Sequence, residues 1–366
     1  MMSIHSNNVK ILHLITSLRT GGAEHLLVDL LPRLKNLGDD VDLAVLDGTR
    51  TPFYCELESR SIRVIPFSVG GSVYNPLNIF RLLKIFPHYD VIHTHNTSAQ
   101  FFAVVAHIFR KKCLVTTEHS TNNKRRYWRY LKPIDKWMYN QYGEVICISD
   151  AAEQNLKGYL GNTRTHISTI YNGIDFSKFA EAVPSEDIMC ECLGKKLITM
   201  VASFRPPKDQ MTLIKSLIYL PDEYEILFVG DGEYRKEVEE NTSEAGLSSR
   251  VHFLGVRTDV PGILKASDVV VLSSHYEGLS LSSVEGMASG KPFIASDVDG
   301  LREVVKGHGI LFPLGDEKTL AEEILKLAND ESYRENIVDK CVARARQFDI
   351  SIMAEEYHNL YHKLVN

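Results

Sequence analysis

The sequence predicts an α/β protein made of two domains, each a parallel β-sheet with helices on both faces. Apolar segments of strand length alternate with helical patterns along most of the chain, which is the order of a doubly wound sheet. Most of these segments are apolar without interruption, as in strands that are buried on both faces. The chain has 366 residues and about a dozen such segments, more than one sheet commonly holds. Two sheets are therefore expected.

The first half opens with a strand at residues 11–15, a loop that ends in Gly21-Gly22, and a helix over 23–37. Further strands are expected at 41–46, around Val64, and at 91–95, 114–117 and 145–149, and further helices include 99–109 and 127–142. The second half repeats the alternation, with strands expected at 197–203, 225–229, 251–254, 269–273, 293–296 and 310–312.

The domain boundary is expected after Asp175, where the apolar periodicity is lost and Pro184 follows. This divides the chain into an N-terminal domain at residues 1–180 and a C-terminal domain at 181–349. The last segment, 350–366, has the apolar spacing of a helix.

Composition narrows the class of protein. The formal net charge of −6 argues against a general nucleic-acid binder, and 44% apolar residues are ordinary for a globular protein. Six scattered cysteines suit reduced thiols better than a disulfide framework, and their spacing does not predict a zinc site. The start of the chain does not resemble an export signal, and we find no segment long enough to span a membrane. We expect a cytoplasmic protein.

The segment 273–292, SSHYEGLSLSSVEGMASGKP, is the strongest candidate for a site. The strand expected at 269–273 leads into it, and the segment predicts a loop with Glu277 and a short helix with Glu285, which Ser280 or Ser282 can cap and which Gly290 can end. In open α/β sheets, ligands bind at the carboxyl ends of the strands. The two carboxylates can therefore face one crevice, either as proton-transfer groups, as in a glycosidase, or as groups that hold hydroxyls.

Two cations, Arg205 and Lys208, follow the first strand of the second half, and Gly230 follows the next. Cations beside a helix start would bind a diphosphate, whereas a solvated loop would explain either one alone. In the first half, Gly21-Gly22 can bring backbone N–H groups to an anion or simply make a tight turn. The pair does not match the dinucleotide fingerprint, which disfavours a nicotinamide enzyme.

Histidines end two neighbouring strands of the first half: His93 and His95 in VIHTH, and His119 in TTEHS. Imidazoles at strand ends can hydrogen-bond a substrate hydroxyl, although a single histidine of this kind is more often structural. Of the three, His119 has the best position to meet a substrate. Neither their spacing nor their neighbours indicate a metal.

Together these segments resemble family 4 glycosyltransferases. Besides the pair Glu277 and Glu285, the matching segments occur in the family's order: TGGAEHLL, DVIHTHN, VTTEHS, VICIS, IYNGID, SFRPPKD and FVGDGE. The resemblance implies the GT-B fold, two Rossmann-like domains facing across a cleft, with the last helix crossing back to the N-terminal domain. It also implies sugar transfer from a nucleotide-diphosphate sugar, with retention of anomeric configuration and without a metal or other cofactor.

The resemblance also implies roles for individual residues. Glu285 would bind the ribose, Glu277 the transferred sugar, and the backbone of Gly278, Leu279, Ser280 and Leu281 the diphosphate and sugar. Arg205 and Lys208 would neutralise the leaving diphosphate, His119 would touch the donor sugar, and Gly21, Gly22 and Gly230 would line the site. Many members place the phosphate arginine where this chain has Ser203, and Arg205 is offset by two, as in glucosaminyl-malate synthases. Uridine as the base rests on its frequency in the family.

A further motif, Asp297-Val-Asp299, matches the manganese-binding pattern of the other large glycosyltransferase fold. Its place after a parallel strand favours a loop without a metal. A basic and aromatic stretch, Arg125, Arg126, Trp128 and Arg129, is typical of a contact with an anionic membrane, with a solvated helix face as the alternative.

We therefore expect a glycosyltransferase that extends a glycan or polyprenyl-diphosphate-linked acceptor at the inner face of the cell membrane, in surface polysaccharide or glycoconjugate assembly. Three alternatives remain at this point: transfer to a small soluble acceptor such as malate, a sugar-nucleotide 2-epimerase on the same fold, and an inactive module that binds the nucleotide sugar.

Overall fold

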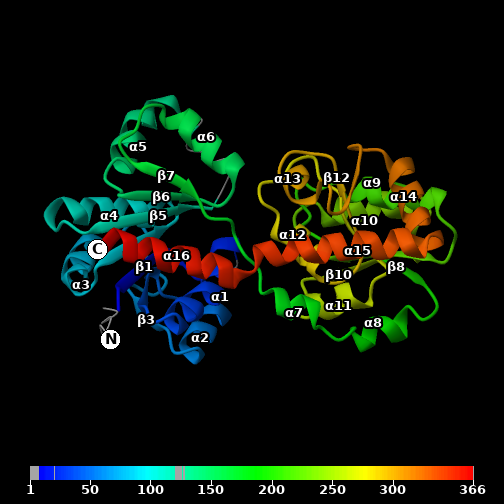
Figure 1. Cartoon of the computed structure of the whole chain (residues 1–366), viewed down its shortest axis with the longest axis horizontal. Helices are drawn as coiled ribbons and strands as arrows, with labels where there is room; N and C mark the ends of the chain where they lie inside the picture. Colours follow the sequence, from blue (N-terminus) through cyan, green and yellow to red (C-terminus); the bar gives the residue numbers. More distant parts are fainter. Residues whose placement is uncertain (1–7, 20, 120–125, 127, 366) are drawn as a thin grey trace, which may run out of the picture. The chain divides into compact units, whose positions relative to one another are not determined.

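The structure is a computed structural model, which describes residues 8–19, 21–119, 126 and 128–365. Two compact units make up the chain (Figure 1). Unit 1 comprises Met1–Gly173 and Ile350–Asn366, and unit 2 comprises Ile174–Asp349. Among the described residues, every helix is too short or too polar to cross a lipid bilayer.

Unit 1 is built on a seven-stranded parallel sheet of order β3-β2-β1-β4-β5-β6-β7. Its strands are β1 Lys10–Ser17, β2 Asp40–Asp47, β3 Arg63–Pro66, β4 Val91–His95, β5 Cys113–Glu118, β6 Glu144–Cys147 and β7 His166–Thr169. Its helices are α1 Gly22–Asn36, α2 Pro52–Ser59, α3 Leu77–Ile85, α4 Thr97–Phe109, α5 Lys132–Tyr139, α6 Asp150–Leu160 and α16 Ile350–Val365.

The two faces of this sheet carry separate hydrophobic cores. Apolar residues of α1, α2 and α16 cover one face, and those of α3, α4, α5 and α6 cover the other. The last helix, α16, packs against α1 through Met353, Tyr357 and Tyr361. The expected return of the chain's end to the N-terminal domain is therefore confirmed.

Unit 2 is built on a six-stranded parallel sheet of order β10-β9-β8-β11-β12-β13. Its strands are β8 Lys196–Val201, β9 Tyr224–Val229, β10 Val251–Gly255, β11 Val269–Leu272, β12 Phe293–Ser296 and β13 Ile310–Phe312. Its helices are α7 Phe176–Ala180, α8 Glu186–Glu191, α9 Gln210–Ser216, α10 Arg235–Glu244, α11 Val260–Ala266, α12 Leu281–Ala288, α13 Leu301–Val305, α14 Glu317–Asn329 and α15 Glu331–Ala345.

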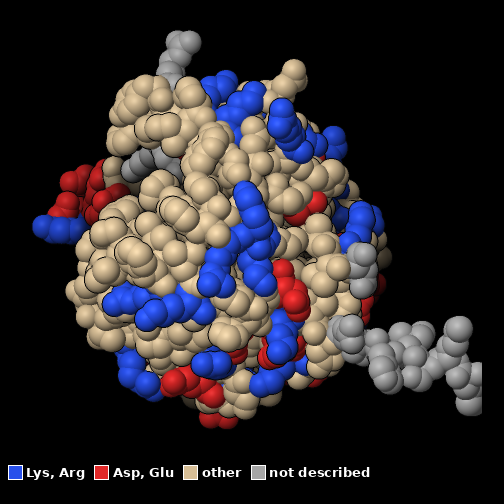
Figure 2. Space-filling model, turned by 90° about the vertical axis from the view of Figure 1, so that its left-hand side faces the viewer, with Lys and Arg blue, Asp and Glu red and all other residues tan. Residues whose placement is uncertain are grey.

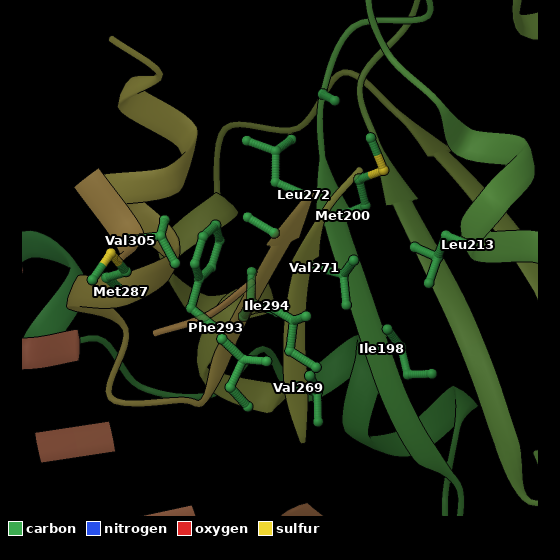
Figure 3. Close-up of a cluster of buried hydrophobic side chains, with 14 of the residues drawn as sticks. Ile198, Met200, Leu213, Val269, Val271, Leu272, Met287, Phe293, Ile294 and Val305 are labelled. Atoms are coloured by element: carbon green, nitrogen blue, oxygen red, sulfur yellow. The ribbon is translucent and has the colours of Figure 1, made fainter. Parts of the chain in front are cut away.

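The centre of unit 2 is an apolar core of buried side chains around β8, β11 and β12. Figure 3 shows Phe293 of β12 beside Met287 of α12 and Val305 of α13. The contact between α12 and the sheet is close, because a Cβ added at Gly286 would lie 2.7 Å from the Phe293 ring. This packing holds the start of α12 at a fixed place above the sheet edge.

Two elements differ from the expectation. Strand β7 was not expected, because it is a short edge strand, His166–Thr169, in which Ile167 is the only apolar residue. The helix expected over 127–142 is shorter: α5 begins at Lys132 with Pro133 in its first turn, where proline is favoured, after a 3₁₀ turn at Arg129–Leu131. Residue 127 lies outside the described residues.

Candidate functional site

The site in unit 2 lies where the strand order reverses. Strands β8 and β11 are neighbours, while the chain runs from β8 toward β10 on one side and from β11 toward β13 on the other. The loops that follow two such strands leave in opposite directions, which opens a crevice at their carboxyl ends. Arg205 and Lys208 lie in the loop after β8, and Glu277 lies in the loop after β11.

Lys208 and Glu277 form an ion pair across this point, and both side chains are largely buried. Ser274 donates a second hydrogen bond to the same carboxylate oxygen, at 2.7 Å. The structure thus brings together two residues that are 69 positions apart in the sequence. Ser274 lies within the candidate segment 273–292 but was not singled out as a site residue, and its place directly after a strand could have indicated it.

Backbone contacts hold the two loops against each other. The N–H of Asp209 donates to the carbonyl of Ser273 at 3.0 Å, and the N–H of His275 donates to Pro207 at 2.8 Å. Between these contacts, the backbones of Lys208 and Ser274 pair as a single antiparallel β-bridge. The ion pair is therefore set in a fixed backbone frame.

Arg205 lies in the same loop but differs from Lys208 in its surroundings. Its side chain is exposed, and we find no carboxylate paired with it in the described part of the chain. An exposed guanidinium at the carboxyl end of a strand can bind an incoming phosphate with two parallel hydrogen bonds.

Helix α12 begins at Leu281, with Ser280 at the N-cap position. The Ser280 side chain makes no capping hydrogen bond; instead the Ser283 hydroxyl donates to the Ser280 carbonyl at 2.6 Å. The first backbone N–H groups of a helix have no partner within the helix and attract anions. Glu285 lies one turn further along α12, and Gly290 follows the helix with a left-handed φ of 74°.

Gly230 allows two loops of the site to approach closely. Its φ is +136°, and an added Cβ would lie 2.1 Å from the carbonyl oxygen of Ala202, in the loop after β8. A side chain would therefore displace the backbone that carries Arg205 and Lys208.

In unit 1, Gly21 is the N-cap of α1 and Gly22 is its first residue. Neither has a positive φ, so the pair is not required by a left-handed turn. A Cβ at Gly21 would lie 2.2 Å from a carboxylate oxygen of Glu24, which folds back over the helix start. The carboxylate thus lies where the helix end attracts negative charge.

His119 follows β5 and stands at the end of a buried chain of histidines. Its Nε2 lies 2.9 Å from Nδ1 of His95, whose Nε2 lies 3.0 Å from Nδ1 of His13. His93 bonds separately to the hydroxyls of Tyr361 and Thr117. Burial lowers the pKa of His13 to about 3 and that of His119 to about 4. The linked histidines His13, His95 and His119 are therefore uncharged at neutral pH. His13, at the inner end of this row, was not expected from the sequence.

The expected membrane residue Arg126 is not at the surface. Its side chain is 10% exposed and pairs with Glu118 at 2.9 Å. Gln100 and Tyr139 donate to the other oxygen of the same carboxylate. Arg126 thus pairs with the buried carboxylate of Glu118, next to His119 in the sequence. The assignment of Arg126 as a membrane contact is wrong.

The other residues of the basic and aromatic stretch 125–129 differ in their surroundings. Arg125 lies outside the described residues, and Arg129 begins the 3₁₀ turn before α5. Trp128 is 57% exposed and its ring stacks on Tyr130. The acidic residue of α5, Asp135, is buried and accepts a hydrogen bond from Tyr159.

The two carboxylates of the motif Asp297-Val-Asp299, after β12, both form ion pairs with Arg302. Arg302 donates to Asp297 at 2.6 Å and to Asp299 at 2.9 Å. Both carboxylates thus have a charged partner within their own loop.

Comparison with known proteins relates both units to sugar transfer. The profile of the family "Glycosyltransferase Family 4" matches residues 20–178, and that of "Glycosyl transferases group 1" matches residues 192–344. The UDP-Gal:alpha-D-GlcNAc-diphosphoundecaprenol alpha-1,3-galactosyltransferase of Escherichia coli is 28% identical, over 93% of this chain and 92% of its own. The N,N'-diacetylbacillosaminyl-diphospho-undecaprenol alpha-1,3-N-acetylgalactosaminyltransferase of Campylobacter jejuni is 26% identical, over 93% and 96%.

Among solved structures, Anabaena HepE in complex with UDP has a TM-score of 0.84 and 25% identity, covering 97% of this chain and 100% of its own. The matched profiles together span most of the chain, and each falls on one sheet. The chain belongs to the family 4 glycosyltransferases and has the GT-B fold.

Proposed function

We propose that this glycosyltransferase moves a hexose or N-acetylhexosamine from a UDP-sugar to a glycan carried on a polyprenyl diphosphate. The E. coli and C. jejuni relatives have activities of this kind, and HepE binds UDP. The observation that carries the proposal is the meeting of Lys208 and Glu277 beside the start of α12, where strands β8 and β11 diverge.

In this proposal the donor lies over the carboxyl ends of β8 and β11. Glu285 holds the ribose hydroxyls, Glu277 holds the transferred sugar, and the start of α12 faces the diphosphate. Arg205, with no carboxylate paired to it among the described residues, takes a phosphate directly. Lys208 keeps its contact with Glu277 and turns its remaining N–H donors toward the leaving phosphate.

We propose further that transfer retains the anomeric configuration and needs no metal ion. Negative charge develops on the diphosphate as the glycosidic bond breaks, and fixed cations in a water-poor site stabilise such charge. The departing phosphate oxygen can accept the proton of the attacking hydroxyl on the same face of the sugar. The pairing of Asp297 and Asp299 with Arg302 supports a role for these residues outside metal binding.

For the acceptor, we propose that unit 1 rests on an anionic membrane through α3, α4 and α5. Large apolar side chains are exposed along these helices, among them Phe80, Phe109 and Trp137, at 63%, 70% and 43%. The three helices are neighbours in the order α3, α4, α5. Basic residues stand between the apolar ones, including Lys84 and Arg110. Figure 2 faces this side of unit 1 and shows more Lys and Arg than Asp and Glu.

Such a mixture fits the boundary between headgroups and acyl chains, where each basic residue contributes about 1 kcal/mol. Flotation with liposomes that contain an anionic lipid tests this contact. Lys84→Glu combined with Arg110→Glu should lower the bound fraction severalfold, and Lys236→Glu, on an 87% exposed side chain of unit 2, should not. Equal binding by all three proteins would overturn the membrane contact and leave the donor site untouched.

Calorimetric titration with UDP, GDP and ADP tests the donor site. UDP should bind, and Glu285→Ala should weaken its binding severalfold or more. Glu331→Ala, at a 77% exposed side chain, is the matched control. The absence of binding by any nucleotide would refute the proposal.

The anomeric configuration of the product, determined by NMR, tests whether the transfer retains configuration. The transfer activity should be unchanged in the presence of EDTA, because no metal ion is needed in the proposed reaction.

A further inference from the structure

Three side chains meet at one edge of unit 1, apart from the residues assigned to sugar transfer. His358 and His362 are four residues apart on α16, so they lie on the same face of that helix. Asp39 comes from the turn between α1 and β2. Nδ1 of His358 lies 2.9 Å from one oxygen of Asp39, and Nε2 of His362 lies 3.1 Å from the other.

Asp39 is unusual for a carboxylate, because its side chain is fully buried. Among the described residues, only these two imidazoles pair with Asp39, and neither a Lys nor an Arg side chain does. A buried carboxylate needs a compensating positive charge, which proteins supply with a basic side chain or a metal ion. A metal ion bound by both imidazoles and the carboxylate would supply that charge.

The geometry suits a metal ion. The ligand atoms of the three residues all lie within 4.8 Å of one another. Neighbouring ligands of a divalent ion with bonds of about 2.1 Å are separated by about 3.0 Å in an octahedron and about 3.4 Å in a tetrahedron. The two nitrogen–oxygen distances are close to these values. Each histidine is 26% exposed, so an ion could enter from solvent and keep water as its remaining ligands.

Two other groups of similar residues are less suited. His13, His93 and His95 are fully buried, so an ion could not reach them from solvent as it could reach His358 and His362. In the group of Cys192, Glu225 and His252, the carboxylate already pairs with Lys195.

We propose that Asp39, His358 and His362 bind a divalent transition-metal ion of the zinc or nickel type. Imidazole and carboxylate together favour such ions over calcium or magnesium. Paired histidines at this helical spacing are a known way to present two ligands on one side of an ion. The ion would fasten the last helix to the turn after α1 and so stabilise unit 1, because a ligand that binds only the folded state adds to its stability. This role is structural and independent of the transfer reaction.

The test is a calorimetric titration of the full chain, without a histidine tag, with Zn²⁺ and with Ni²⁺. One equivalent should bind, and the affinity should fall at least tenfold in His358→Gln and in His362→Gln. Glutamine can still donate a hydrogen bond to Asp39, so these variants keep the contact while losing the metal ligand. His88→Gln, at an exposed histidine of unit 1, is the matched control and should bind as the parent does.

Thermal unfolding gives a second measurement. Zn²⁺ should raise the midpoint of the parent by about 2–4 °C or more and should leave both glutamine variants unchanged. If neither ion binds, or if binding survives both substitutions, the proposal is overturned. If a glutamine variant does not fold, Asp39→Asn replaces it and should show the same loss.

Discussion

Nδ1 of His95, at the end of β4, lies 2.9 Å from Nε2 of His119, which directly follows the neighbouring strand β5, and this contact links the tautomers of the two residues. A neutral imidazole has one donor and one acceptor nitrogen, and His95 uses its other nitrogen on His13. If one proton moves, all three must. Nε2 of His13 has no hydrogen-bond partner among the described residues. A buried acceptor without a partner is tolerated better than a buried N–H, so all three protons are expected on Nδ1.

Nitrogen-15 NMR of the histidine rings checks this first prediction. The parent should show His119 protonated on Nδ1, which would leave that N–H as the donor for the sugar contact that the family resemblance implies. His95→Phe removes the acceptor and donor that fix the tautomer, so His119 should shift toward the Nε2–H form that imidazole prefers in water. Tyr361→Phe, which removes the hydroxyl that bonds His93, should leave His119 unchanged. A parent His119 protonated on Nε2 would contradict the linkage.

The same burial predicts that unit 1 loses stability in mild acid. His13 has a pKa lowered to about 3 by burial, and the pKa values of His93 and His95 are also lowered well below the usual value, chiefly by burial. Below the unfolded pKa of about 6.5, the unfolded state binds protons that the folded state excludes. Stability therefore falls as pH decreases from about 6.5 toward the folded pKa, by up to about 1.4 kcal/mol per pH unit for each histidine.

Urea unfolding at pH 5 and pH 7, followed by tryptophan fluorescence, measures this effect. Both tryptophans of the chain, Trp128 and Trp137, lie in unit 1, so the signal reports that unit. The parent should be markedly less stable at pH 5, and His13→Gln should reduce the difference. His88→Gln, at an exposed ring, should leave the difference as it is, and equal stability of the parent at both pH values would refute the prediction.

The sequence was a good guide where a signal is local. Strand β4 occurs at residues 91–95 as expected, and the apolar runs of β9, β11 and β12 lie within one residue of their expected bounds. The expected helix after Glu277 forms and is followed by Gly290 in the left-handed conformation that its place after the helix requires. Continuous apolar strands and helix-ending glycines depend on neighbouring residues, so they can be read from the chain alone.

The sequence was a poor guide where burial depends on distant residues. Arg126 belongs to a basic stretch, yet its partner Glu118 draws it inward. His13 resembles an ordinary polar residue within an apolar strand, and only the pairing of β1 with β4 places it beside His95. The contact of Lys208 with Glu277 likewise depends on the order of strands β8 and β11. Such pairings follow from topology, which local patterns do not contain.

Gly230→Ala should disrupt the donor site through the backbone. The residue has a φ of +136°, and an added Cβ would lie 2.1 Å from a backbone oxygen, so strain and a clash add together. We expect a loss of about 3 kcal/mol or more in the stability of unit 2 and a loss of UDP binding. Gly246→Ala, at φ +71° with open space around it, carries the strain alone and should lose about 1–2 kcal/mol while binding UDP normally. Equal effects of the two substitutions would show that the close approach to Ala202 is unimportant.

Lys208→Met should separate catalysis from binding. Methionine keeps the length of the side chain but removes the charge that faces Glu277 and, in the proposed reaction, the leaving diphosphate. Loss of one preorganised charge in such a site lowers kcat by about 10²–10³-fold. UDP affinity should change less, because Arg205 and the start of α12 also face the phosphates in this arrangement. Steady-state kinetics with a UDP-sugar, beside calorimetry with UDP, measure the two effects. Lys236→Met, on an 87% exposed side chain, should leave both unchanged, and a Lys208→Met enzyme with a kcat within threefold of the parent would exclude Lys208 from the chemical step.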